Sequence, residues 1–256
     1  MNIYTDVAGW SVFRDSLGRG AAASSIGFVP TMGALHAGHL SLVKSSQRDN
    51  DITVVSIFVN PTQFNQAADL EHYPRTTAAD LAFLQASNTD AVFMPDAASL
   101  YPDAYAFRVS ESAFSQRLCG AHRPGHFDGV LTVVMKLFNI IRPARAYFGE
   151  KDYQQLQLVR GMVGAFFLPL SIVACPTVRE ADGLAMSSRN ARLDAQQRAQ
   201  APGLFGALKS AGSAAQAREQ LEQLGFDVDY VEDLDGRRLG AVRLGEVRLI
   251  DNVAIG

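Results

Sequence analysis

The sequence predicts an α/β fold in which a doubly wound parallel sheet is followed by a small α+β C-terminal domain. Apolar, strand-like runs alternate with helix-like segments through most of the chain. The run 52–59 (ITVVSIFV) is almost continuously β-branched or aromatic, which is typical of a strand covered on both faces. After Val178 the composition changes to segments rich in Arg, Ala and Gln. Repeated strand–helix–strand order implies parallel pairing through right-handed crossovers.

The first predicted strand is the apolar run 26–29, which Pro30 ends, and apolar residues at helical spacing follow at 40–48. The later elements repeat this order: strand 52–59, helix 78–86, strand 91–94 ended by Pro95, helix 130–141, strand 146–148, helix 153–166 and strand 170–174. In such sheets ligands bind beyond the carboxyl ends of the strands. Polar residues that directly follow these strands are therefore the candidates for a site.

The second domain is predicted from a helix over 194–224 and from short strands at 228–231 and 247–250. We place the boundary near Thr177, which divides the 256 residues into domains 1–177 and 178–256. Small residues predict a loop at 20–25 and a weak helix at 211–217.

Composition excludes several classes of protein. With 48% hydrophobic residues and a mean hydropathy of +0.03 the chain is not disordered. A net charge of −3 offers no positive field for nucleic acid or an anionic membrane, so we expect neither as a partner. The run 162–175 is interrupted by Pro169 and is too short to span a bilayer, and residues 1–10 do not read as a signal peptide. Cys119 and Cys175 have no CxxC partner, so we expect a cytoplasmic protein.

The first polar cluster is 30–39 (PTMGALHAGH), at a strand-to-helix turn. Gly33 and Gly38 permit a tight backbone, and His36 and His39 would place imidazoles and free N–H groups around an anion. The alternatives are a glycine turn with two solvated histidines, or a metal site. Zinc needs a third ligand and normally uses a nearby cysteine or carboxylate, which this segment lacks.

The second and fourth clusters are 60–64 (NPTQF) and 186–190 (MSSRN). Uncharged amides in the second cluster suit the orientation of hydroxyl groups or a carbonyl, although alone the segment reads as a turn.

Two hydroxyls and a guanidinium in the fourth cluster suit a phosphate clamp. The alternative for the fourth cluster is a helix N-cap with a surface arginine.

The third cluster is 149–155 (GEKDYQQ). Gly149 permits close backbone approach, Lys151 supplies a point charge for phosphate, and Asp152 is placed to cap the following helix or to accept from a ribose. Gln155 then falls one helical turn in, on the side of the cleft. The alternative is an ordinary N-cap with a surface lysine.

Together the four clusters resemble the pantothenate synthetase (pantoate–β-alanine ligase) family, in the order PTMGALHAGH, NPTQF, GEKDYQQL and READGLAMSSRN. The resemblance extends to FNQAADLEHYPRT, RPGHFDGVLTVVMKLFNIIRP and the C-terminal RLIDN, and so covers most of residues 1–200 and the end of the chain. The family belongs to the HxGH nucleotidylyltransferase superfamily. The resemblance therefore implies a Rossmann-like catalytic domain at 1–177 and a small lid domain at 178–256.

The resemblance implies an ATP- and magnesium-dependent condensation of pantoate with β-alanine through a pantoyl adenylate, with release of AMP and pyrophosphate. It also implies a homodimer, and it does not identify the magnesium ligands. Implied catalytic residues are His36, His39, Lys151, Ser187, Ser188 and Arg189, with His36 as proton donor. Implied ATP-binding residues are Pro30, Met32, Gly33, Ala34, Leu35, His36, Ala37, Gly38, His39, Gly149, Glu150, Lys151, Asp152, Val178, Met186, Ser187, Ser188 and Arg189. Pantoate is assigned to Met32, Gln63 and Gln155, β-alanine to Asn60 and Gln63, and Tyr73, Asp80, Arg123 and His126 are further candidates.

Two departures from the family pattern are visible. Cys119 in RLCG stands where the family commonly has an acidic residue, and the stretch before RLGEVRLIDN is shorter than usual, so the C-terminal domain is expected to be trimmed. Another HxGH transferase with a phosphate acceptor is one alternative, although Gln63 and Gln155 suit a hydroxy acid better. A nucleotide-binding relative that has lost turnover is the other.

Overall fold

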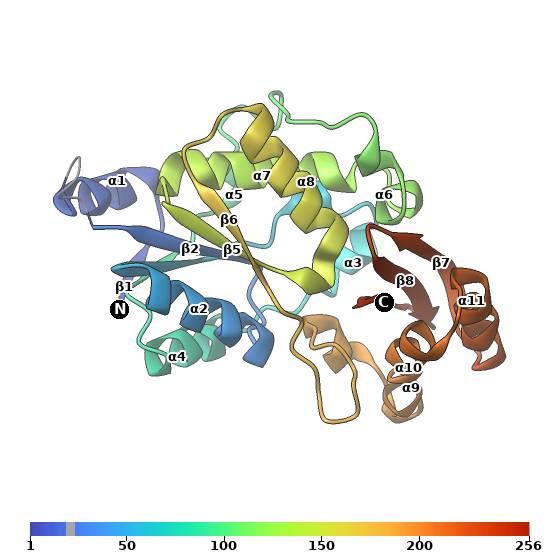
Figure 1. Cartoon of the computed structure of the whole chain (residues 1–256). Helices are drawn as coiled ribbons and strands as arrows, with labels where there is room; N and C mark the ends of the chain where they lie inside the picture. The colour runs from blue at the N-terminus through green and yellow to red at the C-terminus, as the bar shows by residue number, and fades with distance from the viewer. Residues whose placement is uncertain (19–23, 256) are drawn as a thin grey trace. The chain divides into compact units, whose positions relative to one another are not determined.

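A computed structural model describes residues 1–18 and 24–255, so most of the loop predicted at 20–25 lies outside the described residues. The chain forms two compact units (Figure 1). The first, which we call the sheet unit, consists of Met1–Leu35, His39–Gly149 and Gln154–Cys175. The second, the C-terminal unit, consists of His36–Gly38, Glu150–Tyr153 and Pro176–Gly256.

The sheet unit is built on a six-stranded parallel sheet, and the predicted α/β class is confirmed. The strand order is β1-β4-β3-β2-β5-β6. The strands are β1 (Asn2–Tyr4), β2 (Ile26–Thr31), β3 (Ile52–Ile57), β4 (Ala91–Phe93), β5 (Arg145–Gly149) and β6 (Ser171–Cys175). The order runs outward from β2 to β4 and, on the other side, from β5 to β6. The direction of winding therefore reverses between β2 and β5.

Helices cover both faces of this sheet (Figure 1). One face carries α2 (Ala37–Asp49) and α4 (Thr77–Ala86), and the other carries α1 (Val7–Ser16), α7 (His126–Ile141) and α8 (Tyr153–Ala165). Shorter elements are α3 (Ala67–Glu71), α5 (Ala97–Leu100), α6 (Cys119–His122) and the 3-10 helices η2 (Pro61–Gln63), η3 (Phe114–Gln116), η4 (Glu150–Asp152) and η5 (Ser188–Arg192). Burial on two sides explains why the strand sequences are continuously apolar.

The core has one part on each face of the sheet. Leu42 and Val43 of α2 and Leu84 of α4 belong to the same buried cluster as Val29 and Val55 of the strands. On the other face Phe138 of α7 makes T-shaped contacts with Phe28 and Phe148, each at 6.4 Å between ring centroids.

Strands β2 and β5 pair only at their amino halves, where Gly27 lies opposite Arg145 and Phe28 opposite Ala146. Pro30 was expected to end the strand, but β2 continues through it to Thr31. The carbonyl of Thr31 accepts from the amide of Phe58, next to β3, at 3.1 Å, so the alternate residue Pro30 faces β5. Pairing with β5 has already ended there, so no partner needs the N–H that proline lacks. The carboxyl ends of β2 and β5 thus diverge at the point where ligands bind in doubly wound sheets.

The C-terminal unit contains three helices and an antiparallel sheet of β7 (Asp227–Leu234), β8 (Arg237–Leu244) and β9 (Val247–Ala254), and the last two helices bury side chains in the same core cluster as the strands. The single helix predicted over 194–224 is wrong, because the segment forms α9 (Ala195–Gln200), α10 (Gly203–Ser210) and α11 (Ala214–Gln223). Pro202 stands at the N-cap of α10, and Ser213 caps α11 by accepting from the amide of Gln216. A proline and a serine cap divide the run although its composition favours helix throughout.

Candidate active site

The residues predicted for the site divide between the two units. The sheet unit holds Pro30, Met32, Gly33, Ala34, Leu35, His39, Asn60, Gln63, Tyr73, Asp80, Arg123, His126, Gly149 and Gln155. The C-terminal unit holds His36, Ala37, Gly38, Glu150, Lys151, Asp152, Val178, Met186, Ser187, Ser188 and Arg189. The first three polar clusters lie at the ends of β2, β3 and β5, as the sequence predicts, whereas the fourth, 186–190, begins well beyond the end of β6 and overlaps η5.

The turn after β2 is anchored by the buried carboxylate of Asp80, which is 3% exposed. Its two oxygens accept from the amides of Ala34 at 2.9 Å and Leu35 at 2.8 Å, and Thr76 donates a third hydrogen bond at 3.1 Å. Gly33 has φ +79°, and a Cβ there would lie 3.0 Å from the Asp80 carboxylate. Only glycine satisfies both the backbone angle and this approach. Asp80 thus supports the turn from beneath.

His36 is held as a neutral imidazole. The amide of Gly38 donates to Nδ1 of His36 at 3.1 Å, so Nδ1 carries no proton and the ring hydrogen resides on Nε2. Burial, together with the positive charge of Lys151, lowers the pKa of His36 to about 4, against smaller opposing effects of Asp152 and Glu180. At neutral pH His36 therefore offers an Nε2–H donor without carrying a charge.

The turn that contains Gly38 packs against the loop that contains Met186. A Cβ on Gly38 would lie 2.8 Å from Cε1 of His36 and 3.7 Å from Cβ of Met186. The amide of Met186 in turn donates to the carbonyl of Val178 at 2.9 Å, so the segment 178–186 folds back on itself. Within the C-terminal unit the first and fourth clusters are therefore adjacent.

The segment that carries Lys151 is positioned by the end of the chain. Asn252 of β9 donates from Nδ2 to the carbonyls of Glu150 at 2.8 Å and Lys151 at 3.1 Å. Arg237 donates both to Oδ1 of Asn252 at 2.7 Å and to the Glu150 carboxylate at 2.8 Å. Nζ of Lys151 lies 3.8 Å from Asp152, and the lysine side chain is 18% exposed. The asparagine of the C-terminal RLIDN motif therefore holds the main chain of the segment that carries Lys151.

Ser187 is the N-cap of η5, and its hydroxyl accepts from the amide of Arg189 at 3.3 Å. The interpretation of the fourth cluster as a helix N-cap is therefore confirmed for Ser187. A hydroxyl that accepts at a cap still has its proton to donate, so this use does not exclude phosphate binding. Asn190 fastens the same segment by donating to Glu180 at 3.2 Å.

Arg179 holds the strand-like part of this loop. Its guanidinium forms a bidentate pair with Asp251 at 2.5 and 2.9 Å, donates to the carbonyl of Gly183 at 3.0 Å and stacks over the ring of Phe205. The Asp251 side chain is 2% exposed. A buried, fully partnered pair of this kind fixes the loop that leads to residues 186–189.

In the sheet unit the second cluster surrounds Gln63. Nδ2 of Asn60 donates to Oε1 of Gln63 at 3.0 Å, and Nε2 of Gln63 lies 3.2 Å from the sulfur of Met32. The main-chain carbonyl of Gln63 accepts from Nδ1 of His126 at 2.8 Å and from Arg123 at 3.3 Å. Three predicted substrate residues thus meet, and two of the further candidates hold the main chain of Gln63.

Of the remaining predicted residues, two lie in the first turns of helices and one lies in the core. His39 is the third residue of α2 and Gln155 the third of α8. Gln155 makes no side-chain hydrogen bond with any described residue, so its amide is available to a ligand. Tyr73 is 5% exposed and packs edge-on against Phe64 at 5.6 Å, as a core residue would.

The sequence did not point to Tyr101 or assign a role to Asn252. The hydroxyl of Tyr101 donates to Oδ1 of Asn60 at 2.8 Å. The sequence gives a local signal only for Asn252, which follows Asp251 within the RLIDN motif and directly after the apolar residues Leu249 and Ile250. Tyr101 follows the short helix α5, and nothing in the local pattern distinguishes it from an ordinary core aromatic.

Among residues 1–18 and 24–255 no group of three His, Cys, Asp or Glu side chains is arranged to hold a metal ion. Over the same residues no helix has the length and apolar character needed to cross a bilayer. Cys119 and Cys175 are both buried thiols that form no disulfide.

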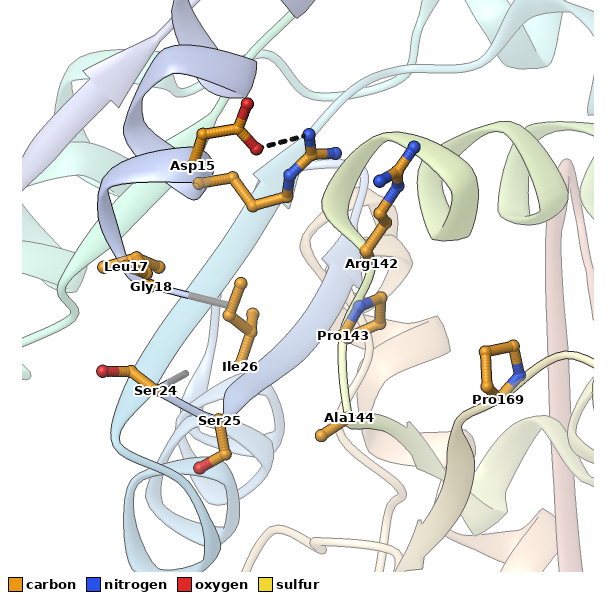
Figure 2. Close-up of a pocket in the computed structure, with 11 residues that line it drawn as sticks. Asp15, Leu17, Gly18, Ser24, Ser25, Ile26, Arg142, Pro143, Ala144 and Pro169 are labelled. Atoms are coloured by element: carbon orange, nitrogen blue, oxygen red, sulfur yellow. Dashed lines mark hydrogen bonds and ion pairs between the residues drawn. The ribbon is translucent and has the colours of Figure 1, made fainter. Parts of the chain in front are cut away.

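A cavity of about 730 Å³ opens at the amino ends of the strands (Figure 2). Arg142 and Ala144 before β5 and Ile26 at the start of β2 line it, together with Pro169 before β6. Figure 2 also shows Asp15 paired with a guanidinium at its rim. No predicted site residue lines this cavity, and within the sheet unit it lies at the opposite end of the strands from the second polar cluster, which follows β3.

Comparison with known proteins identifies the family. Residues 3–254 match the family model described as Pantoate-beta-alanine ligase. A pantothenate synthetase from Bdellovibrio bacteriovorus is 58% identical over 233 residues, which cover 91% of this chain and 93% of that protein. One from Legionella pneumophila (strain Lens) is 51% identical and covers 98% of this chain and 99% of its own.

Solved structures agree. Pantothenate synthetase from Thermus thermophilus superposes with a TM-score of 0.90 at 42% identity, covering 99% of each chain. Pantoate-beta-alanine ligase from Francisella tularensis, complexed with Beta-gamma ATP and Beta-alanine, superposes with a TM-score of 0.94 at 39% identity, covering 99% of this chain and 97% of that one. The chain therefore belongs to the pantoate-beta-alanine ligase family, and it is an enzyme of the ligase class.

Proposed function

We propose that this enzyme joins pantoate to β-alanine in two steps through a pantoyl adenylate. In the first step a carboxylate oxygen of pantoate attacks the α-phosphorus of ATP, and pyrophosphate leaves. In the second the amine of β-alanine attacks the acyl carbon, AMP leaves, and the amine loses a proton as the amide forms. The ATP-dependent condensation follows from family membership; the division of labour among residues is our proposal.

The observation that carries the proposal is the surroundings of His36 in the C-terminal unit. Charges of Lys151, Asp152 and Glu180 act on its imidazole, and the adjoining Gly38 packs against Met186. Three segments far apart in sequence thus bring a neutral N–H donor, an ammonium and the start of the serine–arginine loop into one unit. This combination suits a polyphosphate, which needs donors and positive charge together.

On this account His36 donates from Nε2 to a phosphate oxygen, and Lys151 balances negative charge as it develops in the transition state. His39, Ser187, Ser188 and Arg189 supply further donors to the phosphates. No side chain has to act as a nucleophile. Catalysis then rests on positioning, which can supply about 7–11 kcal/mol, and on preorganised donors.

The acid is proposed to bind in the sheet unit. Oε1 of Gln63 is occupied by Asn60, so Gln63 offers its Nε2–H groups, which suit a carboxylate or hydroxyl oxygen of pantoate. Gln155 is available to the same substrate, and Met32 offers an apolar surface. The side chain of Asn60 is 1% exposed with all its hydrogen-bonding positions occupied, so we propose that β-alanine is met by Gln63 rather than by Asn60.

Magnesium fits this site only when it is bound to the phosphates of the nucleotide. The described residues form no group of three metal ligands, so the protein does not provide a cage. Magnesium commonly enters sites of this kind on substrate phosphates with few protein ligands. We therefore derive no step from a protein-held magnesium ion.

The Francisella relative is complexed with Beta-gamma ATP and Beta-alanine, which supports ATP and β-alanine as substrates of this chain. We further propose a cytoplasmic homodimer whose catalytic domain is 1–177 and whose lid is 178–256.

The test is isotope exchange between pyrophosphate and ATP, with each substrate omitted in turn. The proposal predicts exchange that needs pantoate and does not need β-alanine, and pantothenate formation only with all three substrates. Exchange that requires a phosphorylated acceptor instead of pantoate would overturn the proposed substrate. Pantothenate formation with ADP rather than AMP as product would overturn the adenylate.

A further inference from the structure

The side chain of Asn60 is completely satisfied inside the protein. Its Nδ2 donates to Oε1 of Gln63 at 3.0 Å and to the main-chain carbonyl of Gly129 at 3.1 Å. Its Oδ1 accepts from the hydroxyls of Tyr101 at 2.8 Å and Thr62 at 3.0 Å. An asparagine side chain has two donors and two acceptor positions, so none remains for a ligand.

The orientation of the Asn60 amide follows from these partners. The carbonyl of Gly129 can only accept, so the group that faces it is the amide nitrogen. The opposite side is then the oxygen, and the hydroxyls of Tyr101 and Thr62 must donate to it. Rotating the amide by half a turn would set Oδ1 against the carbonyl of Gly129 and leave two acceptors facing each other.

The orientation of Asn60 sets that of Gln63. Because the Asn60 nitrogen faces Gln63, the Gln63 atom that meets it is the oxygen Oε1. Nε2 of Gln63 is then turned toward Met32, with which its contact is the weak one to sulfur at 3.2 Å. Gln63 thus turns its Nε2–H donors away from Asn60, and a ligand that offers an acceptor oxygen suits this position.

Tyr101 is built into the core as the fixed end of this chain of hydrogen bonds. It is 9% exposed, its ring packs edge-on against Tyr105 at 5.6 Å, and the ammonium of Lys136 lies 5.0 Å from the ring centroid. Burial raises the pKa of Tyr101 to about 12, so its hydroxyl keeps its proton at neutral pH. Its hydroxyl is therefore a constant donor to Asn60.

We propose that Tyr101 is a positioning residue of the acid subsite: through Asn60 it holds the Gln63 amide with its nitrogen toward the substrate. This rests on the proposed function of Gln63. Tyr101 touches no substrate itself, and its effect passes through two amides. The Asn60 and Gln63 amides together favour a substrate with an acceptor oxygen next to Nε2 of Gln63, as a carboxylate or hydroxyl of pantoate provides. They disfavour a substrate that offers a donor at this position.

The test compares Tyr101→Phe with Tyr147→Phe. Both variants delete a buried tyrosine hydroxyl bonded to an asparagine, since Asn50 donates to the hydroxyl of Tyr147 at 2.7 Å. Tyr101→Phe is expected to raise the Kd for pantoate, measured by titration calorimetry, about three- to tenfold with the Kd for ATP unchanged. Tyr147→Phe is expected to lower stability and leave both constants unchanged. Thr62→Val removes the second donor to Asn60 and is expected to act in the same direction as Tyr101→Phe, which keeps the test valid if the latter folds poorly.

A double-mutant cycle with Gln63→Ala separates positioning from general support. If Tyr101 acts through Gln63, its substitution has no further effect on pantoate binding once Gln63 is alanine. An equal loss in both backgrounds, or an unchanged pantoate Kd in Tyr101→Phe and Thr62→Val, would overturn the inference. Absence of pantoate-dependent exchange in the unsubstituted enzyme would overturn the proposed function instead, so the two failures are distinguishable.

Discussion

The side-chain amide of Asn252 donates to the main-chain carbonyl of Lys151 at 3.1 Å and to that of Glu150 at 2.8 Å. The last strand of the chain thereby fixes the backbone of the lysine that we assign to phosphate binding. Both residues belong to the C-terminal unit. Correct placement of Lys151 therefore depends on a donor far away in sequence.

Replacement of Asn252 by Asp removes this donor and sets a carboxylate against two carbonyls. A lost hydrogen bond to a partly buried carbonyl is worth about 1–3 kcal/mol, so we expect kcat/KM for ATP to fall about 5- to 100-fold. Steady-state kinetics checks this. Asn139→Asp is the matched control, because Asn139 is exposed and donates only to the carbonyl of Met135. Equal kinetics in the two variants would contradict the role of Asn252.

His36 predicts a pH dependence of stability. Its pKa is about 4 in the folded protein and about 6.5 in an unfolded chain. As the pH falls from 6.5 toward 4 the unfolded chain takes up a proton that the folded chain excludes, so His36 destabilises the fold progressively over this range. We expect the free energy of unfolding to drop by about 1–2 kcal/mol more in the native protein than in His36→Gln between pH 7 and 4.5, allowing for screening.

Urea denaturation at the two pH values measures this difference. His72→Gln, which changes an exposed histidine, should follow the native protein. Parallel loss of stability in native protein and His36→Gln would mean that His36 is not held neutral.

Asp80 anchors three donors with its two oxygens, and Asp80→Asn replaces one oxygen with a donor. We expect the turn at 33–35 to loosen, with a fall of about 10- to 100-fold in kcat/KM for ATP and some loss of stability, because one main-chain amide loses its acceptor. Asp90→Asn is the control, since Asp90 accepts from the main-chain amide of Thr53 at the amino end of β3. If both variants lose stability but keep ATP kinetics, the turn does not depend on Asp80.

Asp251→Ala removes the carboxylate that pairs with the Arg179 guanidinium in the C-terminal unit. Removing one partner of a fully buried pair costs about 3–5 kcal/mol, and the 21% exposure of the Arg179 side chain reduces this cost, so we expect a clear but smaller loss of unfolding free energy, measured by urea denaturation. The surface pair of Arg48 and Asp49 provides the contrast, because the Arg48 side chain is 71% exposed and Arg48→Ala should leave the free energy of unfolding almost unchanged. A small effect of Asp251→Ala would show that the loop is held by other contacts.

The parallel sheet could be predicted because its strands are buried on both faces and their sequences are therefore apolar and β-branched. Strands β3 and β5 were placed within a few residues for that reason. The short edge strand β1 and the helix α1 were not predicted, because burial there rests on isolated contacts such as those of Trp10. In the C-terminal unit β8 lacks an obvious signal, since it begins with two charged residues, Arg237 and Arg238, which pair with Glu150 far away in sequence and with Asp233 across the hairpin.

The phosphate-binding candidates could be predicted because glycines, histidines and serines at strand ends carry their chemistry in the local sequence. The residues that position these candidates could not be predicted, because they contact residues that are far away in sequence. Tyr101 reaches Asn60 and Asn252 reaches Lys151 only once the chain is folded. A short motif therefore indicates candidate groups for a ligand, but not the residues that hold those groups in orientation.

The most direct measurement of the central claim is the fate of an oxygen label. Pantoate labelled with ¹⁸O in both carboxylate oxygens is converted with ATP and β-alanine, and AMP, pyrophosphate and any inorganic phosphate are analysed by mass spectrometry. Attack of the carboxylate on the α-phosphorus predicts one labelled oxygen in every AMP formed and none in pyrophosphate. AMP without label, or label in inorganic phosphate, would contradict a pantoyl adenylate formed at this site.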